Sequence, residues 1–142
     1  MNELQAALNL GDRLLPRERL LIEATLGSIA DTPRAALEKW KIFAALYPDD
    51  FTGQANYAFF GWILANRFDD EMLKSAQVGA SPRNPHATNA NLLLADLFLG
   101  NERYADATRY YTLAEGTVTA TRTVDLAAAY AAQPPSPRCA SL

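Results

Sequence analysis

Residues 91 to 114 read NLLLADLFLGNERYADATRYYTLA, and their apolar side chains recur at intervals of three and four rather than two. Such spacing is typical of α-helices with one apolar face, whereas strands alternate with a period of two. Gly100 interrupts the pattern, and glycine readily adopts the left-handed conformation common just past a helix end. The stretch therefore predicts two antiparallel helices, at about 86–99 and 103–115, joined by a short turn.

The same signals for helix starts and ends recur through the rest of the chain. Thr32 can cap a helix that begins at Pro33, since proline is favoured in the first helical turn. Asp50 and the acidic run from Asp69 stand where negative charge favours a helix N-terminus. These signals predict further helices at about 2–10, 17–29, 33–46, 51–65, 69–79 and 121–132.

Similar residues in different helices are separated by multiples of one repeat length. Asn56 and Asn91 lie 35 residues apart, and Trp40 and Tyr111 lie 71 apart, which is the sum of 35 and 36. Helical hairpins repeated at such a period stack into a solenoid. We therefore expect an all-α helical-hairpin solenoid as a single domain over residues 1–132. It would contain three repeats, at about 17–50, 51–85 and 86–116, with flanking N- and C-terminal helices. A flexible Pro/Ser-rich tail would follow at 133–142.

This period and these residue types resemble the tetratricopeptide repeat (TPR) family, whose helical hairpins carry small residues at close contacts and aromatic residues between them. The third unit carries the resemblance best, through Leu99, Gly100, Tyr104, Ala107, Tyr111 and Ala114. In the middle unit Glu71 and Ser75 stand where a small and an aromatic residue are expected, which predicts a weakly packed second helix. The stretches 17–23 and 46–50 also look like TPR regions attached to bacterial signalling proteins.

Charge and hydropathy exclude two classes of partner. The chain of 142 residues has 13 Lys and Arg against 16 Asp and Glu, with both signs scattered, which is unlike the basic surface that nucleic acid requires. The longest charge-free stretch, Phe51–Asn66, is shorter than the roughly 20 apolar residues of a membrane span. Glu3 lies near the N-terminus and no basic leader precedes an apolar run, so we expect a cytoplasmic protein.

The sequence lacks the usual signatures of an enzyme. There is no glycine-rich phosphate loop and no nucleophile motif, and the single His86 has no partner at helical spacing. With only Cys139 besides, neither a zinc site nor an internal disulfide can form. The acidic pairs 49–50 and 69–71 lie at predicted helix starts, where capping explains them. We therefore expect no catalysis, no cofactor and no metal.

The helix predicted around Tyr57–Ala65 is apolar on all sides, so it must be covered on all sides or line a binding surface. The TPR resemblance implies a concave groove formed by the first helix of each repeat. Its residues here would be Asn56, Phe59, Trp62, Ile63, Asn91, Leu94 and Phe98. Family members that grip a terminal carboxylate use Lys and Arg at such positions, and none occurs here. We therefore expect a noncatalytic module that binds another protein or peptide in an apolar groove.

Two alternatives remain open at this point. The chain could be a self-associating scaffold, which would form a homodimer through the ends of the stack. It could also be a small secretion-type chaperone, since such proteins are similar in being short chains of about three TPR units. The helix predicted at 121–132 has one apolar stripe, so it could either cap the stack or lie in the groove.

Overall fold

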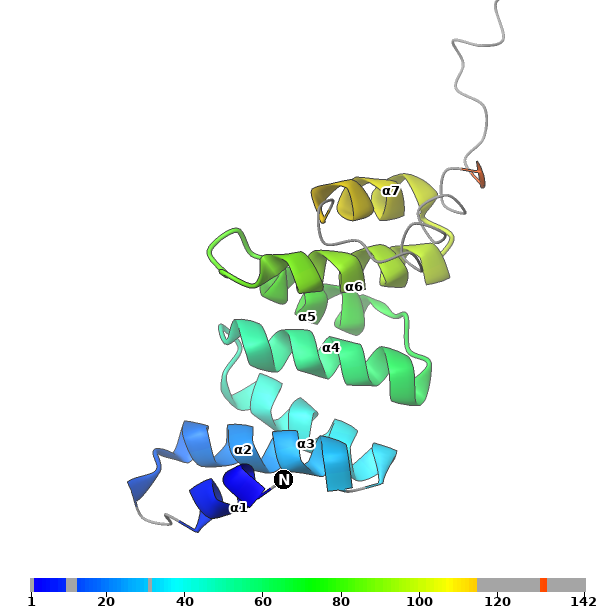
Figure 1. Ribbon diagram of the computed structural model, residues 1–142. Helices are drawn as coiled ribbons and strands as arrows, with labels where there is room; N and C mark the ends of the chain where they lie inside the picture. The colour runs from blue at the N-terminus through cyan, green and yellow to red at the C-terminus, as the bar shows by residue number, and fades with distance from the viewer. Residues whose placement is uncertain (1, 10–12, 31, 115–130, 133–142) are drawn as a thin grey trace, which may run out of the picture.

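The computed structural model describes residues 2–9, 13–30, 32–114 and 131–132. Within these residues the chain forms seven α-helices and no strand. Figure 1 shows the helices stacked in chain order, from α1 beside α2 at one end to α7 at the other. Their bounds are α1 Asn2–Leu8, α2 Pro16–Ala30, α3 Pro33–Leu46, α4 Phe51–Ala65, α5 Asp70–Gly79, α6 Ala87–Gly100 and α7 Tyr104–Leu113. The predicted all-α class is confirmed.

Side-chain caps begin three of the helices at the predicted positions. Thr32 accepts a hydrogen bond from a backbone N–H in the first turn of α3, which has Pro33 at its start. Asp50 caps α4, where its Oδ1 lies 2.7 Å from the backbone nitrogen of Gly53. Asp69 caps α5 by accepting two backbone N–H groups. Each cap satisfies donors that the helix itself leaves unpaired, which explains why these helices begin at these residues.

Consecutive helices pack against one another along the stack. Short links force α2 and α3, α4 and α5, and α6 and α7 into antiparallel pairs. α5 packs against both α4 and α6, and α4 also touches α6 directly. The direct approach of α4 to α6 leaves a cleft between these two helices.

Polar contacts also join one hairpin to the next. The Arg17 guanidinium on α2 donates to the Asp50 carboxylate at the start of α4, and its Nε lies 2.9 Å from Oδ2. Further along, the carboxamide of Asn101 donates to the backbone carbonyl of Phe68 at 2.5 Å. Both contacts span 33 residues in the chain, the first between the starts of α2 and α4 and the second between the turns that follow α4 and α6.

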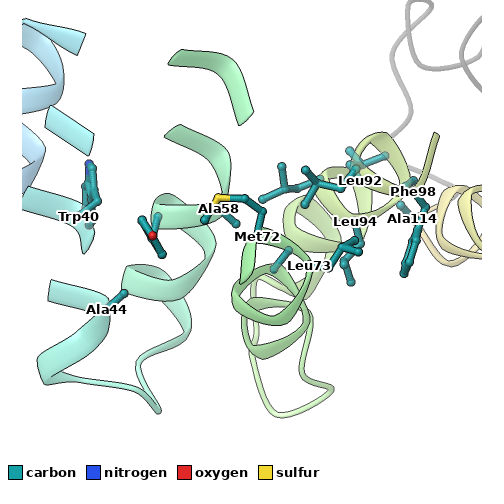
Figure 2. Close-up of a cluster of buried hydrophobic side chains, with 14 of the residues drawn as sticks. Trp40, Ala44, Ala58, Met72, Leu73, Leu92, Leu94, Phe98 and Ala114 are labelled. Atoms are coloured by element: carbon teal, nitrogen blue, oxygen red, sulfur yellow. The ribbon is translucent and has the colours of Figure 1, made fainter. Parts of the chain in front are cut away.

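The core is continuous from α2 to α7, and Figure 2 shows part of it. Trp40 and Tyr111, 71 residues apart, are both fully buried. Each also uses its polar atom: Trp40 Nε1 donates to Ser28 Oγ at 2.7 Å, and Tyr111 Oη donates to Asp96 Oδ1 at 2.7 Å. A buried aromatic ring that is hydrogen-bonded to the other helix of its hairpin fixes the position of that helix.

The middle hairpin is better packed than its sequence predicts. Ser75 is buried as it stands, and the neighbouring Met72 on α5 is completely buried against Gly61 of α4. A methyl group at Gly61 would lie 2.1 Å from the Met72 sulfur, so the glycine makes this close approach possible. Tyr57 from α4 is buried as well. The helix is therefore packed against α4 without an aromatic residue at position 75.

The helix predicted at 121–132 and the tail at 133–142 lie outside the described residues, apart from positions 131 and 132. None of the described helices combines the length and the hydropathy that crossing a bilayer requires.

Candidate functional site: a neutral cleft between α4 and α6

A cleft of about 350 Å³ lies between α4 and α6. One wall comes from α4 and the other from α6, so helices from neighbouring hairpins form it together. The lining residues are Ala55, Asn56, Phe59 and Trp62 of α4 with Asn89, Ala90, Leu92 and Leu93 of α6.

The α4 wall is aromatic. Phe59 is 37% exposed and meets Trp62 edge to face, with 6.2 Å between ring centroids. Phe59 also packs edge to face on Phe60, at 5.3 Å. Phe60 in turn stacks on the buried Trp40 of α3, at 6.0 Å. This row of rings connects the cleft wall to the core, so the wall is a supported surface rather than a set of free side chains.

Small residues bring the helices together beside the cleft. Gly79 ends α5, and a methyl group placed there would lie 2.8 Å from Cβ of Ala55 and 3.3 Å from Cβ of Ala90. Three helices therefore meet where each contributes a residue of minimal size, which permits close helix approach. Because Ala55 and Ala90 also line the cleft, their small side chains leave part of its volume empty.

The cleft carries no charge along either wall. α4 contains no Asp, Glu, Lys or Arg, and α6 contains only Asp96. Asp96 is buried and accepts a hydrogen bond from Tyr111, so it does not face the cleft opening. The polar side-chain groups of the lining are the carboxamides of Asn56 and Asn89 and the indole N–H of Trp62. The chemistry available here is therefore apolar contact combined with neutral hydrogen bonding.

Three residues of the predicted groove lie in this cleft, namely Asn56, Phe59 and Trp62. Ile63 is 46% exposed on the same helix but is not part of the lining. Three of the four predicted α4 residues therefore lie together at one cleft, and their role in binding stays a prediction.

The α6 half of the prediction needs correction. Leu94 and Phe98 are 0% and 3% exposed, and Figure 2 shows both within the buried cluster. Phe98 stacks on Tyr110 of α7 at 5.4 Å, so it belongs to the core of its own hairpin. Asn91 and Leu94 line a different hollow, of about 450 Å³, which is also lined by Tyr110.

The error has a geometric cause. Moving the groove positions of α4 by 35 residues assumes that α6 presents the same side of its helix, and it does not. α6 turns Asn89, Ala90, Leu92 and Leu93 toward α4 instead. No signal in the sequence marks this rotation, because α6 is apolar on nearly every side.

A polar cluster joins the end of α4 to the start of α5. Arg67 donates to Asp69 Oδ2 at 2.7 Å and to Glu71 Oε2 at 2.6 Å. Tyr57 Oη donates to Glu71 Oε1 at 2.8 Å, and Arg67 also reaches this hydroxyl at 3.2 Å. The four side chains satisfy one another across the turn, so the cluster holds the hairpin together.

The pKa values in this cluster shift as the contacts require. The hydrogen bond from Arg67, then the one from Tyr57, lowers the pKa of Glu71. Burial alone would raise the pKa of Asp69, but bonds from Arg67 and the backbone outweigh burial and lower it. Burial and the bond to Glu71 raise the pKa of Tyr57. These shifts stabilise the charged carboxylates, which suits a structural role rather than proton transfer.

The other acidic and metal-binding candidates lie apart from the cleft. Among the described residues, no group of three or more His, Cys, Asp and Glu side chains is placed to hold a metal ion. His86 is exposed at the start of α6, and Cys139 falls outside the described residues.

Comparison with known proteins gave no match: no family model fits the chain, and neither curated proteins nor solved structures include a significant relative.

Proposed function

We propose that this chain is a noncatalytic protein–protein interaction module with a TPR-like solenoid fold. It binds a peptide or helix of another protein in the cleft between α4 and α6, and it does so in the cytoplasm, as expected from the sequence.

The solenoid part of the proposal is supported by the order of packing. α5 lies against its own partner α4 and against α6 of the next hairpin, as neighbouring units do in a stacked array. Trp40 and Tyr111 occupy equivalent buried positions in the first and third hairpins. The contacts Arg17–Asp50 and Asn101–Phe68 recur at one spacing between successive units.

The observation that carries the binding proposal is the exposed aromatic wall of a neutral cleft. Phe59 keeps more than a third of its surface in contact with water, and the adjacent Ile63 keeps nearly half. Grouped apolar surface beside a hollow is the usual mark of a contact site, whereas single exposed apolar residues are common everywhere. The lining consists of aromatic, aliphatic and amide side chains, which can bind but cannot act as nucleophile or general base.

A displayed library of random peptides, selected on the whole chain, tests this function. Phe59→Glu places a charge in the cleft, and Ile42→Glu makes the same change on α3, where Ile42 is 50% exposed outside the cleft. Selected peptides should bind the wild type and Ile42→Glu equally. They should bind Phe59→Glu at least about fivefold more weakly, since a cleft residue of this kind contributes over 1 kcal/mol. Failure to select any peptide, or equal loss in both variants, would refute the proposal.

Self-association is a second candidate, because Ile42 and Leu46 lie one turn apart on α3 and are both exposed. Sedimentation velocity at increasing concentration distinguishes the two functions. A homodimer formed through this exposed face of α3 should be lost in Ile42→Glu and retained in Phe59→Glu, which is the opposite of the pattern expected for the cleft. A role as a secretion-type chaperone would use the same cleft for a secreted partner.

A further inference from the structure

We infer that the cleft between α4 and α6 selects a neutral aromatic side chain of the bound segment and holds the adjoining backbone through Asn56 and Asn89. This inference rests on the proposed function, because it specifies what the partner presents to the site.

The lining of the cleft is uncharged. None of the eight lining side chains is ionised, and both walls lack exposed charges along their full length. A charged side chain that entered the cleft would lose hydration without gaining a counterion, and such desolvation is strongly unfavourable. The cleft therefore rejects Lys, Arg, Asp and Glu, although a fifth of this chain's own residues are of these types.

The cleft has the size and shape to hold one aromatic side chain. At about 350 Å³ the cleft lies near the lower end of the roughly 300–1,000 Å³ range of small-molecule sites, which suits one large side chain with its flanking backbone. The ring planes of Phe59 and Trp62 stand at 71° to each other, so they offer an edge and a face. A third ring can pack against such a pair in the offset or edge-to-face geometry that aromatic groups prefer.

Two asparagine side chains in the lining offer hydrogen bonds to a bound segment. Asn56 is partly exposed on α4, and Asn89 is exposed on α6. Within the described residues, neither carboxamide is hydrogen-bonded to another group of the protein. A carboxamide both donates and accepts, and so does a peptide unit, so each can pair with the main chain of a bound segment. Phosphate or carboxylate groups would instead call for cationic donors, which the lining lacks.

Amino-acid amides provide probes for this selectivity. The N-acetyl amides of phenylalanine, lysine and aspartic acid share one backbone and differ in the side chain. Two-dimensional NMR of the whole chain would follow the side-chain amides of Asn56 and Asn89 and the indole N–H of Trp62. We expect the phenylalanine amide to shift all three signals in a saturable way, with about fivefold or higher preference over the charged amides.

Two variants make the result specific to the cleft. Phe59→Ala removes one ring of the wall and should weaken binding of the phenylalanine amide at least about threefold. Ile42→Ala truncates an exposed apolar residue elsewhere and should leave binding unchanged. Charged amides that bind as tightly as the aromatic one, or shifts that lie outside the cleft, would overturn the inference. A dimer that is lost in Phe59→Glu would overturn it too, because a second copy would then fill the cleft.

The displayed peptides separate this inference from the proposed function. Selected peptides that need Phe59 and share an aromatic residue support both. Peptides that need Phe59 but share no aromatic residue overturn the inference and leave the function standing. If no peptide is selected while the phenylalanine amide still binds, the proposed function fails and the preference of the cleft for neutral rings is upheld.

Discussion

Replacement of Trp40 by alanine tests the packing of the first hairpin on the second. Trp40 is 1% exposed and belongs to α3. Its ring stacks on Phe60 of α4 at 6.0 Å and meets Phe43 edge to face at 6.1 Å. The residue therefore contacts its own helix, α2 through Ser28, and the next hairpin.

The expected loss follows from these contacts. Truncation of a buried tryptophan costs about 3–5 kcal/mol, because transfer energy is lost and a cavity remains. The broken hydrogen bond adds little to this loss of stability. Without Trp40, Ser28 Oγ no longer accepts a hydrogen bond, but it still donates one to the carbonyl of Ala24 at 2.9 Å. Against a total stability of roughly 5–15 kcal/mol for a domain, Trp40→Ala should remove a large share of the free energy of unfolding while the rest of the core remains.

Urea unfolding followed by circular dichroism measures this loss without relying on the removed chromophore. Ile42→Ala, on the exposed side of the same helix, is the matched control and should change stability by at most about 0.5 kcal/mol. If the free energy of unfolding of Trp40→Ala lies within about 1 kcal/mol of the wild-type value, the Trp40 ring does not hold the two hairpins together.

Two further changes probe a close contact and a charge cluster. Gly53→Ala would place Cβ 2.2 Å from the rigid ring of Phe43, so it should lower the free energy of unfolding in urea by about 1–3 kcal/mol. A variant as stable as the wild type would show that α3 and α4 can move apart without cost. Arg67→Gln removes the bonds that depress the pKa values of Asp69 and Glu71. Carboxyls with depressed pKa values stabilise the fold above their unfolded value of about 4, and this contribution is lost as the pH falls through the folded value. The variant should therefore be less stable than the wild type at pH 7, but its stability should fall less than that of the wild type as the pH drops below about 5. An unchanged pH dependence of the free energy of unfolding would contradict this expectation.

The helices were predictable because their signals are local. A cap such as Asp50 or Asp69 acts within one turn, and the apolar spacing of each helix is read from its own residues. The predicted bounds of 33–46 and 51–65 coincide with α3 and α4, and the other main helices differ by one or two residues. The 71-residue spacing of Trp40 and Tyr111 also predicted their burial, since equivalent positions in stacked hairpins meet equivalent surroundings.

The packing of α5 and the α6 wall of the cleft could not be predicted, because both depend on residues distant in sequence. Burial of α5 depends on Gly61 of α4, which makes room for Met72. The rotation of α6 depends on Gly79 and Ala90, whose small size sets how α5 and α6 meet. Periodicity alone cannot detect such a rotation in a helix that is apolar on nearly every side.

The apolar character of α4 has two physical causes rather than one. Tyr57, Ala58 and Gly61 are buried against the helices on either side, so part of the helix is core in the ordinary sense. Phe59 faces the cleft and stays 37% exposed, and its ring packs on those of Phe60 and Trp62. Stability explains the first group fully and the second only in part. A function that depends on this cleft should therefore be more sensitive to Phe59 than the free energy of unfolding is.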